Sequence, residues 1–218
     1  MKPLFAFVGL TLVTLLPSYA QTTVNFDGVD TSSGPVSGTA LATYLGDYGI
    51  TLSGVTAGTT VEIIASPGAA FPAYSGNNMI TQSGTAESQS YTLTFALPVN
   101  DVSIVRGEYN GSNPPSTNSG ILYPQWSLTA YSGATDLGSV GENLNGVYTD
   151  MPAQTFSLNY TGITSLTFEG NAEGEAGLGS PLLDNLEFTQ TPEPSTWALV
   201  AGGLGLLALR QVRRIRAS

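Results

Sequence analysis

The chemistry available to this chain has to come from carboxylates, amides, hydroxyls and aromatic rings. The sequence contains no cysteine and no histidine, but 16 Asp and Glu residues among 218. Ser-His-Asp and Cys-His catalysis are excluded because the base is missing. Disulfides and Cys/His zinc sites are excluded as well. Two kinds of carboxylate chemistry remain, which are acid–base catalysis by a pair and oxygen ligation of a cation such as calcium.

Pairs of carboxylates hydrolyse glycosides when they flank the scissile bond. Asp101 with Glu108, or Glu169 with Asp184, would be such pairs. Nothing in the spacing distinguishes either pair from other combinations of the acidic residues. We therefore expect no enzymatic activity, and a polysaccharide hydrolase is the third of three hypotheses.

Sugar binding requires exposed aromatic rings together with amide or carboxylate groups for the hydroxyls. Residues 67–76 form an irregular segment that carries Tyr74, and Asn77 and Asn78 follow it. Residues 110–120 form a polar loop flanked by two more tyrosines. Trp126 lies in a strand pattern and is expected in the core. The predicted ligand-binding residues are Tyr74, Asn78, Tyr109 and Tyr123.

The charge of the chain is distributed unevenly. Residues 21–190 hold 15 of the acidic residues and one basic residue, Arg106, so their net charge is 1 − 15 = −14. Nucleic-acid binding needs Lys and Arg to neutralise phosphates, and we exclude it. Such acidity favours solubility outside the cell, and it also suits cation binding.

Alternating apolar and polar residues predict nine or ten short strands, whereas helical periodicity is hard to find. The clearest strand is 91–97, which places Tyr91, Leu93, Phe95 and Leu97 on one face. A turn at Pro98 separates it from the next strand. Strands joined by Gly-, Pro- and Asn-rich turns predict an all-β domain, a β-sandwich, with a jelly roll as the expected version. The predicted strands are 23–26, 49–55, 60–65, 91–97, 99–105, 125–131, 155–160, 163–168 and 182–188.

Three short segments, 25–28 (NFDG), 98–104 (PVNDVSI) and 183–188 (LDNLEF), resemble extracellular jelly-roll domains related to carbohydrate-binding modules. In many such sandwiches the first and last strands come together, and an acidic residue in each binds calcium. The resemblance therefore implies a structural Ca²⁺ between Asp27 and Asp184, with Asn25 or Asn185 as helpers. The alternative is that each carboxylate caps a turn or faces water.

The start of the chain has the pattern of a secretory signal peptide. Lys2 is followed by an apolar run over 4–16, and small residues stand at Ser18 and Ala20. We expect signal peptidase to cleave before Gln21. Residues 1–20 are then a signal peptide, and residues 21–190 are one domain in length.

The end of the chain, residues 191–218, combines a short motif, an apolar run and a basic tip. Pro192, Glu193 and Pro194 precede an uncharged run over 197–209, and four arginines follow it. Thirteen helical residues span about 20 Å, whereas a bilayer core is about 30 Å thick. We expect a short transmembrane helix whose basic end stays in the cytoplasm, which leaves the body outside.

This C-terminal pattern resembles the PEP-CTERM sorting signal of Gram-negative bacteria. The resemblance implies that an exosortase, a membrane enzyme thought to cut near the motif, recognises Pro192, Glu193 and Pro194. It also implies a link to exopolysaccharide and biofilm. We therefore expect an exported protein, anchored transiently in the membrane and then held at the cell surface or in the extracellular matrix. Its expected role is structural or adhesive; a carbohydrate-binding module supported by calcium is the alternative.

Overall fold

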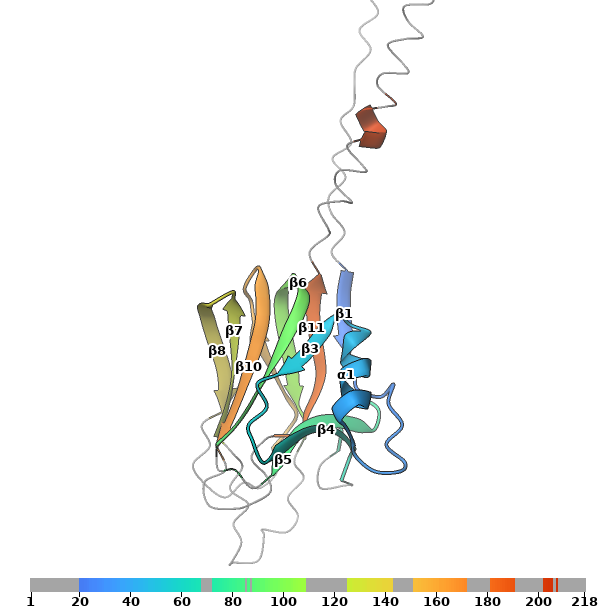
Figure 1. Cartoon of the computed structure of the whole chain (residues 1–218), viewed down its shortest axis with the longest axis vertical. Coiled ribbons are helices and arrows are strands. Elements are labelled where there is room, and N and C mark those ends of the chain that lie inside the picture. Colours follow the sequence, from blue (N-terminus) through green and yellow to red (C-terminus); the bar gives the residue numbers. More distant parts are fainter. Residues whose placement is uncertain are drawn as a thin grey trace, which may run out of the picture. The chain divides into compact units, whose positions relative to one another are not determined.

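The computed structural model describes residues 20–67, 72–84, 86, 88–108, 125–142, 151–171, 181–190, 202–205 and 207. The chain divides into two compact units. Figure 1 shows the strands and the helix of the larger one. One unit is Ala20–Thr191, and the other combines Met1–Tyr19 with Pro192–Ser218. In the second unit the described residues are helical. Within the described part of the chain, no helix combines the length and hydropathy of a membrane span, so the expected transmembrane helix is not shown.

The first unit is built from antiparallel strands and one helix. The elements with bounds are β1 (Ala20–Val24), β2 (Val36–Ser37), α1 (Gly38–Gly46), β3 (Ile50–Ser53), β4 (Thr59–Ala65), β5 (Asn78–Gly84), β6 (Ser88–Arg106), β7 (Gln125–Ser132), β8 (Thr135–Glu142), β9 (Gln154–Leu158), β10 (Ile163–Asn171) and β11 (Leu183–Gln190). All of these strands join one hydrogen-bonded sheet, in which β2-β4-β5-β11-β6-β10-β7-β8 are successive neighbours. The structure confirms the all-β class. It does not confirm the jelly roll.

Strand β6 connects two layers of this sheet. Its first half pairs with β3 and β10, and its second half pairs with β9 and β11. The register against β10 shifts between Ile163, which lies opposite Val99, and Ser165, which lies opposite Thr94. Pro98 falls in this interval, and a proline cannot donate to the ladder. The two strands predicted on either side of Pro98 are therefore the two halves of β6.

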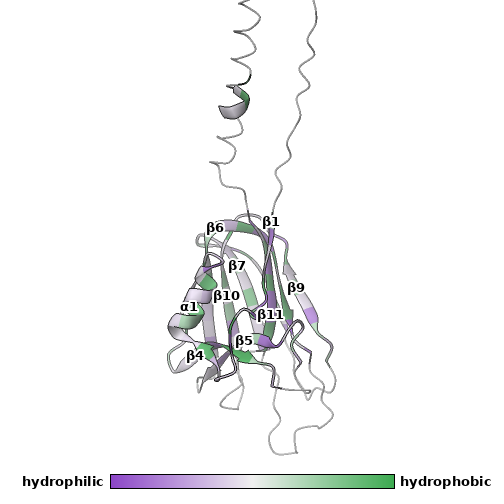
Figure 2. Cartoon of the chain, turned by 90° about the vertical axis from the view of Figure 1, so that its right-hand side faces the viewer, coloured by the Kyte–Doolittle hydropathy of each residue, from purple (hydrophilic) through white to green (hydrophobic). Residues whose placement is uncertain are grey.

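The two layers pack face to face through aromatic rings. Phe95 of β6 lies 5.0 Å from Phe188 of β11, and Trp126 of β7 lies 4.8 Å from Phe156 of β9, measured between ring centroids. Figure 2 shows β7 and β10 in one layer and β9 and β11 in the other. Trp126 is buried, as predicted from its strand pattern. The domain is thus a β-sandwich with its core between the layers.

Helix α1 was not predicted. Leu41 and Leu45, one turn apart, are both fully buried, and the helix packs on β2, β3 and β4. The chain turns out of the helix through Gly49, whose φ of 70° is in the left-handed region that glycine tolerates. This turn places Tyr48 beside the start of β3.

Two further expectations about strands were wrong. The predicted strand 155–160 is too long, since β9 ends at Leu158 and Tyr160 is exposed. The predicted strand 49–55 is also too long. It ends at Ser53, and Gly54 turns the chain with a φ of 63°.

Candidate functional site

The first and last strands of the sandwich lie side by side. β1 pairs antiparallel with β11, with Ala20 opposite Gln190 and Val24 opposite Leu186. Asp27 follows β1 and Asp184 stands near the start of β11. The strand pairing therefore brings the two predicted metal ligands to the same end of the domain.

Asp27 binds the loop that precedes β5. Its Oδ1 accepts hydrogen bonds from the backbone N–H groups of Asn77 (2.8 Å) and Asn78 (3.1 Å). Its own N–H donates to Oδ1 of Asn25 at 3.2 Å. Gly76 makes this approach possible, because a Cβ built on it would stand 1.9 Å from Oδ2 of Asp27.

Asp184 binds the same loop from the other side. Its Oδ2 accepts the N–H of Ser75 at 2.7 Å, and its Oδ1 accepts the N–H of Asn185 at 2.7 Å. The Ser75 hydroxyl donates to Oδ1 of Asn185 at 2.7 Å. Asp184 is completely buried. Burial raises the pKa of this carboxyl, and the charge of Asp27 raises it further, while the N–H donors act in the opposite direction.

These residues match the donor chemistry of calcium, which takes carboxylate and amide oxygens. The site would be held by Asp27 and Asp184, with Asn25 or Asn185 adding amide oxygens. Within the described part of the chain, no group of three or more Asp, Glu, His or Cys residues is arranged to hold a metal. The carboxylates also already cap the loop, as the alternative hypothesis expected. The metal therefore remains a proposal.

The predicted sugar-binding residues fall in different environments. Tyr74 is 56% exposed, and it directly precedes the loop that the two carboxylates hold. Asn78 is buried. Its Nδ2 donates to the carbonyls of Phe26 and Val29, and its Oδ1 accepts the Thr31 hydroxyl. This side chain fixes the segment after β1 and is not open to a ligand. Tyr109 and Tyr123 lie outside the described residues.

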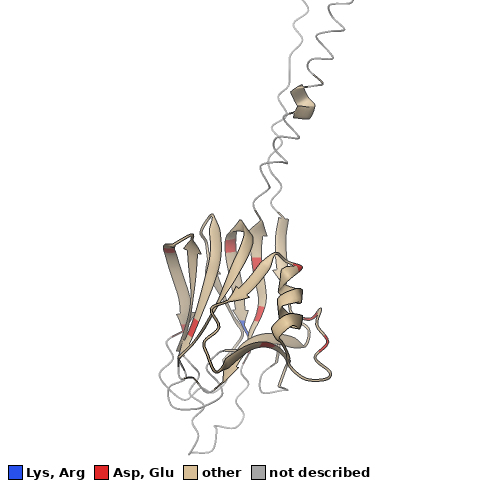
Figure 3. Cartoon of the chain, in the orientation of Figure 1, with Lys and Arg blue, Asp and Glu red and all other residues tan. Residues whose placement is uncertain are grey.

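Arg106, the one basic residue of 21–190, is buried in an ion pair between the layers. Its Nε lies 2.9 Å from Oε2 of Glu142, and both side chains are at most 6% exposed. Glu142 also accepts the indole N–H of Trp126 at 2.8 Å. The other guanidinium nitrogens donate to the carbonyls of Gly107 and Pro152. Figure 3 shows this one basic position among the acidic residues of the drawn domain.

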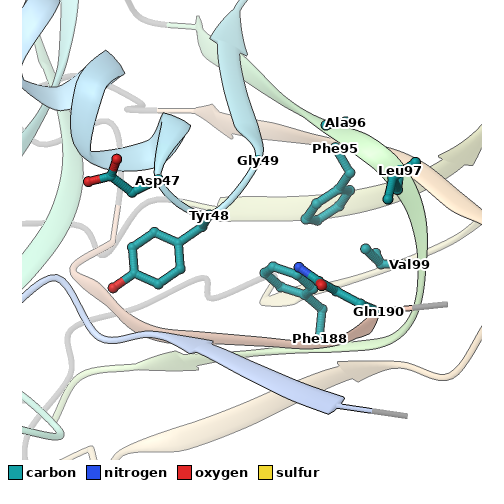
Figure 4. A pocket seen from close by; sticks show the side chains of 9 residues that line it. All are labelled: Asp47, Tyr48, Gly49, Phe95, Ala96, Leu97, Val99, Phe188 and Gln190. Carbon is teal, nitrogen blue, oxygen red and sulfur yellow. The ribbon is translucent and has the colours of Figure 1, made fainter. Parts of the chain in front are cut away.

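A pocket of about 180 Å³ opens at the other end of β11. Figure 4 shows the rings of Tyr48, Phe95 and Phe188 and the amide of Gln190 around it. Asp47, Gly49, Ala96, Leu97 and Val99 complete the lining. The alternation of 91–97 predicted that Phe95 shares a face with Tyr91 and Leu93, but no pocket was predicted. A partial signal was available, since the spacing of Leu41, Tyr44, Leu45 and Tyr48 is helical and would have placed Tyr48 at a helix end.

The C-terminal segment matches a family model described as the PEP-CTERM protein-sorting motif, over residues 190–214. This match confirms the predicted resemblance of the tail. Pro192, Glu193 and Pro194 lie within it, but outside the described residues. A comparison with curated proteins finds no match.

Several solved structures are similar to the body. The Stig cyclase Fisc from Fischerella sp. TAU is 14% identical, with 79% of this chain and 99% of that chain covered and a TM-score of 0.51. At this identity the similarity establishes the fold alone. The CBM22-1 xylan-binding domain of Paenibacillus barcinonensis Xyn10C covers 79% of this chain and 95% of its own at 14% identity, with a TM-score of 0.37.

Proposed function

We propose that this chain, which carries a PEP-CTERM protein-sorting motif, is a non-enzymatic structural or adhesive component of an extracellular polysaccharide layer. The observation that carries the proposal is the motif match over 190–214, which begins at the last residue of β11. The motif implies an exosortase-sorted extracellular protein with transient membrane anchoring. A strongly acidic β-sandwich attached to such a signal suits a soluble extracellular role.

The test is fractionation and intact-mass measurement of the protein from a producing cell. We expect a product that lacks the signal peptide, ends near Pro192, and is found outside the inner membrane. A variant with Pro192, Glu193 and Pro194 all changed to Ala should accumulate as the longer, membrane-held form. A stable full-length protein in the membrane of wild-type cells would refute processing.

Carbohydrate binding supported by calcium is the second candidate function. It is favoured by the position of Tyr74, because an exposed ring directly next to a loop held by two carboxylates is a preorganised stacking surface. A bound cation between Asp27 and Asp184 would stabilise the same loop by neutralising both charges.

Retention on immobilised polysaccharides tests this second function. We expect Tyr74→Ala to lose retention while the melting temperature stays unchanged, since the side chain is exposed. Tyr160→Ala is a matched control, because Tyr160 is also an exposed tyrosine but lies after β9, away from the 75–78 loop. No retention of the wild-type protein on any matrix polysaccharide would refute the proposal.

A further inference from the structure

Four neighbouring strands of one layer repeat a short pattern, in which a leucine stands between two hydroxyl residues. The pattern occurs at 51–53 (TLS) in β3, 92–94 (TLT) in β6, 127–129 (SLT) in β7 and 165–167 (SLT) in β10. Each leucine packs in or against the core. The hydroxyl residues on either side therefore point to the outer face of the layer, because side chains alternate along a strand.

The strand register arranges these residues in two rows across the layer. Figure 1 shows the strands side by side in the order β3, β6, β10, β7 and β8. Taking one residue from each strand in that order, the first row is Ser53, Thr92, Thr167, Thr129 and Ser139. The second row is Thr51, Thr94, Ser165, Tyr131 and Asp136. Adjacent strands lie about 4.8 Å apart, so each row spans roughly 19 Å. We call these ten residues the hydroxyl face.

The hydroxyls of this face are accessible and largely unpaired. Those of Thr51, Ser53, Thr94 and Ser139 belong to exposed residues, and the other hydroxyl residues are partly exposed. Among the described residues, one hydrogen bond joins two side chains of the face, between the Oγ1 atoms of Thr92 and Thr167 at 3.1 Å. Each hydroxyl can both donate and accept a hydrogen bond. The rows thus present donors and acceptors at regular spacing.

The charge of the face restricts its partner. The first row has no charged residue, and the second has one carboxylate, Asp136, at its end. Glu169 extends outward on β10, beyond Thr167. The one basic residue of the body, Arg106, is buried. An anionic polymer would therefore meet carboxylates and no cation, so the face suits a neutral partner.

The size and composition of the face favour a sugar polymer over a protein. Two rows about 7 Å apart and roughly 19 Å long cover well under the area of about 800 Å² that each partner buries in a stable protein interface. Ser and Thr are also rare among the residues that dominate such interfaces. A polysaccharide, in contrast, carries hydroxyls that match the rows. The partly exposed ring of Tyr131, opposite Asp136, combines an aromatic surface with a carboxylate acceptor.

We propose that the hydroxyl face binds a single chain of a neutral polysaccharide, which lies along the rows and places a sugar ring on Tyr131. Adjacent strands are rotated by about 20–25°, so the rows follow a twisted surface that a flexible chain matches better than a crystalline one. The inference rests on the proposed role in a polysaccharide layer. It adds a second contact surface to the Tyr74 loop, and because a polymer repeats its units, both surfaces can hold one polysaccharide, so that losing either weakens retention.

The experiment measures the affinity of the full-length protein in detergent for immobilised polysaccharides. The neutral probes are dextran, galactan and mannan, the anionic probe is alginate, and the rigid probe is microcrystalline cellulose. We expect binding to at least one neutral probe. The double variant Thr94→Val/Thr129→Val removes two hydroxyls but keeps the side-chain shape and strand propensity, and it should weaken this binding about fivefold or more. The double variant Thr94→Ser/Thr129→Ser keeps the hydroxyls and should bind within about twofold of wild type.

Thr155→Val is the matched control, because Thr155 is an exposed strand threonine of the other layer, and it should bind like wild type. Equal melting temperatures of the wild-type and valine-variant proteins exclude a folding defect. Valine variants that bind like wild type while Tyr74→Ala loses retention would overturn the hydroxyl face and leave the loop site standing. Binding to alginate alone or to cellulose alone would overturn the neutral, single-chain ligand. No binding to any neutral probe would also overturn the face, whereas the sorting function is judged separately by the fractionation test.

Discussion

Asp27 and Asp184 hold one short loop from its two sides. Asp27 accepts the N–H groups of Asn77 and Asn78, and Asp184 accepts the N–H of Ser75. The two carboxylates are close enough for the charge of Asp27 to raise the pKa of Asp184. The loop is thus fixed by two like charges, in a body whose one basic residue, Arg106, pairs with Glu142.

A cation at this site should therefore stabilise the fold. At a free calcium concentration of about 100 times Kd, we expect about 2.7 kcal/mol of added unfolding free energy. For a domain of this size that is a rise in melting temperature of roughly 5–10 °C relative to chelator. Asp27→Asn should abolish the rise, whereas Asp47→Asn, at an exposed position away from the loop, should preserve it. A wild-type melting temperature that is identical in calcium and in chelator would refute the metal site.

Gly76 should be essential to the same loop for a steric reason. An added Cβ would meet the Asp27 carboxylate at 1.9 Å, and the φ of 54° is unfavourable for other residues. We expect Gly76→Ala to cost at least about 2 kcal/mol of unfolding free energy in urea. Gly46→Ala is the matched control. Gly46 lies in α1, and a Cβ added to it would meet open space, so this substitution should stabilise the fold by about 0.5–1 kcal/mol. Similar effects of the two substitutions would contradict this account.

The sequence predicted the structure best where neighbouring residues in the chain decide it. Period-two alternation in 91–97 correctly placed Tyr91, Leu93 and Phe95 in the core, because the pleat decides which face a residue occupies. Leu97, predicted on the same face, is instead 43% exposed, because it lies in the irregular stretch beside Pro98 where β6 passes from one layer to the other. Helix α1 was missed because its Gly- and Thr-rich sequence has weak helix propensity. Its apolar stripe, Leu41 to Tyr48, is short. Tertiary packing of Leu41 and Leu45 stabilises that helix.

Contacts between the layers could not be predicted in the same way. Arg106 and Glu142 come from β6 and β8, and they meet because of the strand order and register of the whole sheet. The pairing of Asp27 with the 75–78 loop depends similarly on β5, a strand that was not predicted. Only the meeting of the first and last strands was anticipated, and it came from a resemblance to known sandwiches.

The Arg106–Glu142 ion pair between the layers is buried, so breaking it should strongly reduce the unfolding free energy. Glu142→Ala leaves the buried Arg106 guanidinium without its carboxylate and the Trp126 N–H without its acceptor. We expect a loss of about 3–5 kcal/mol of unfolding free energy. Glu142→Gln keeps the shape of the side chain and one oxygen acceptor, so it should lose less unfolding free energy than Glu142→Ala. Glu187→Ala removes a partly exposed carboxylate that accepts from Gln21 and should cost about 1 kcal/mol or less. A Glu142→Ala protein as stable as Glu187→Ala would show that this pair is not structural.

The buried Tyr91 should make the domain sensitive to alkaline pH. Its ring stacks on Phe168 at 5.0 Å, and burial raises the pKa of its hydroxyl well above the ordinary value. Below a pH of about 10 the hydroxyl is protonated in both states, so this group adds no pH dependence. Above this pH, the hydroxyl loses its proton in the unfolded chain but keeps it in the folded chain. The unfolding free energy then falls by about 1.4 kcal/mol per pH unit. Urea unfolding at increasing alkaline pH should show this fall in wild type and a shallower one in Tyr91→Phe. Equal slopes would mean that this hydroxyl does not titrate on unfolding.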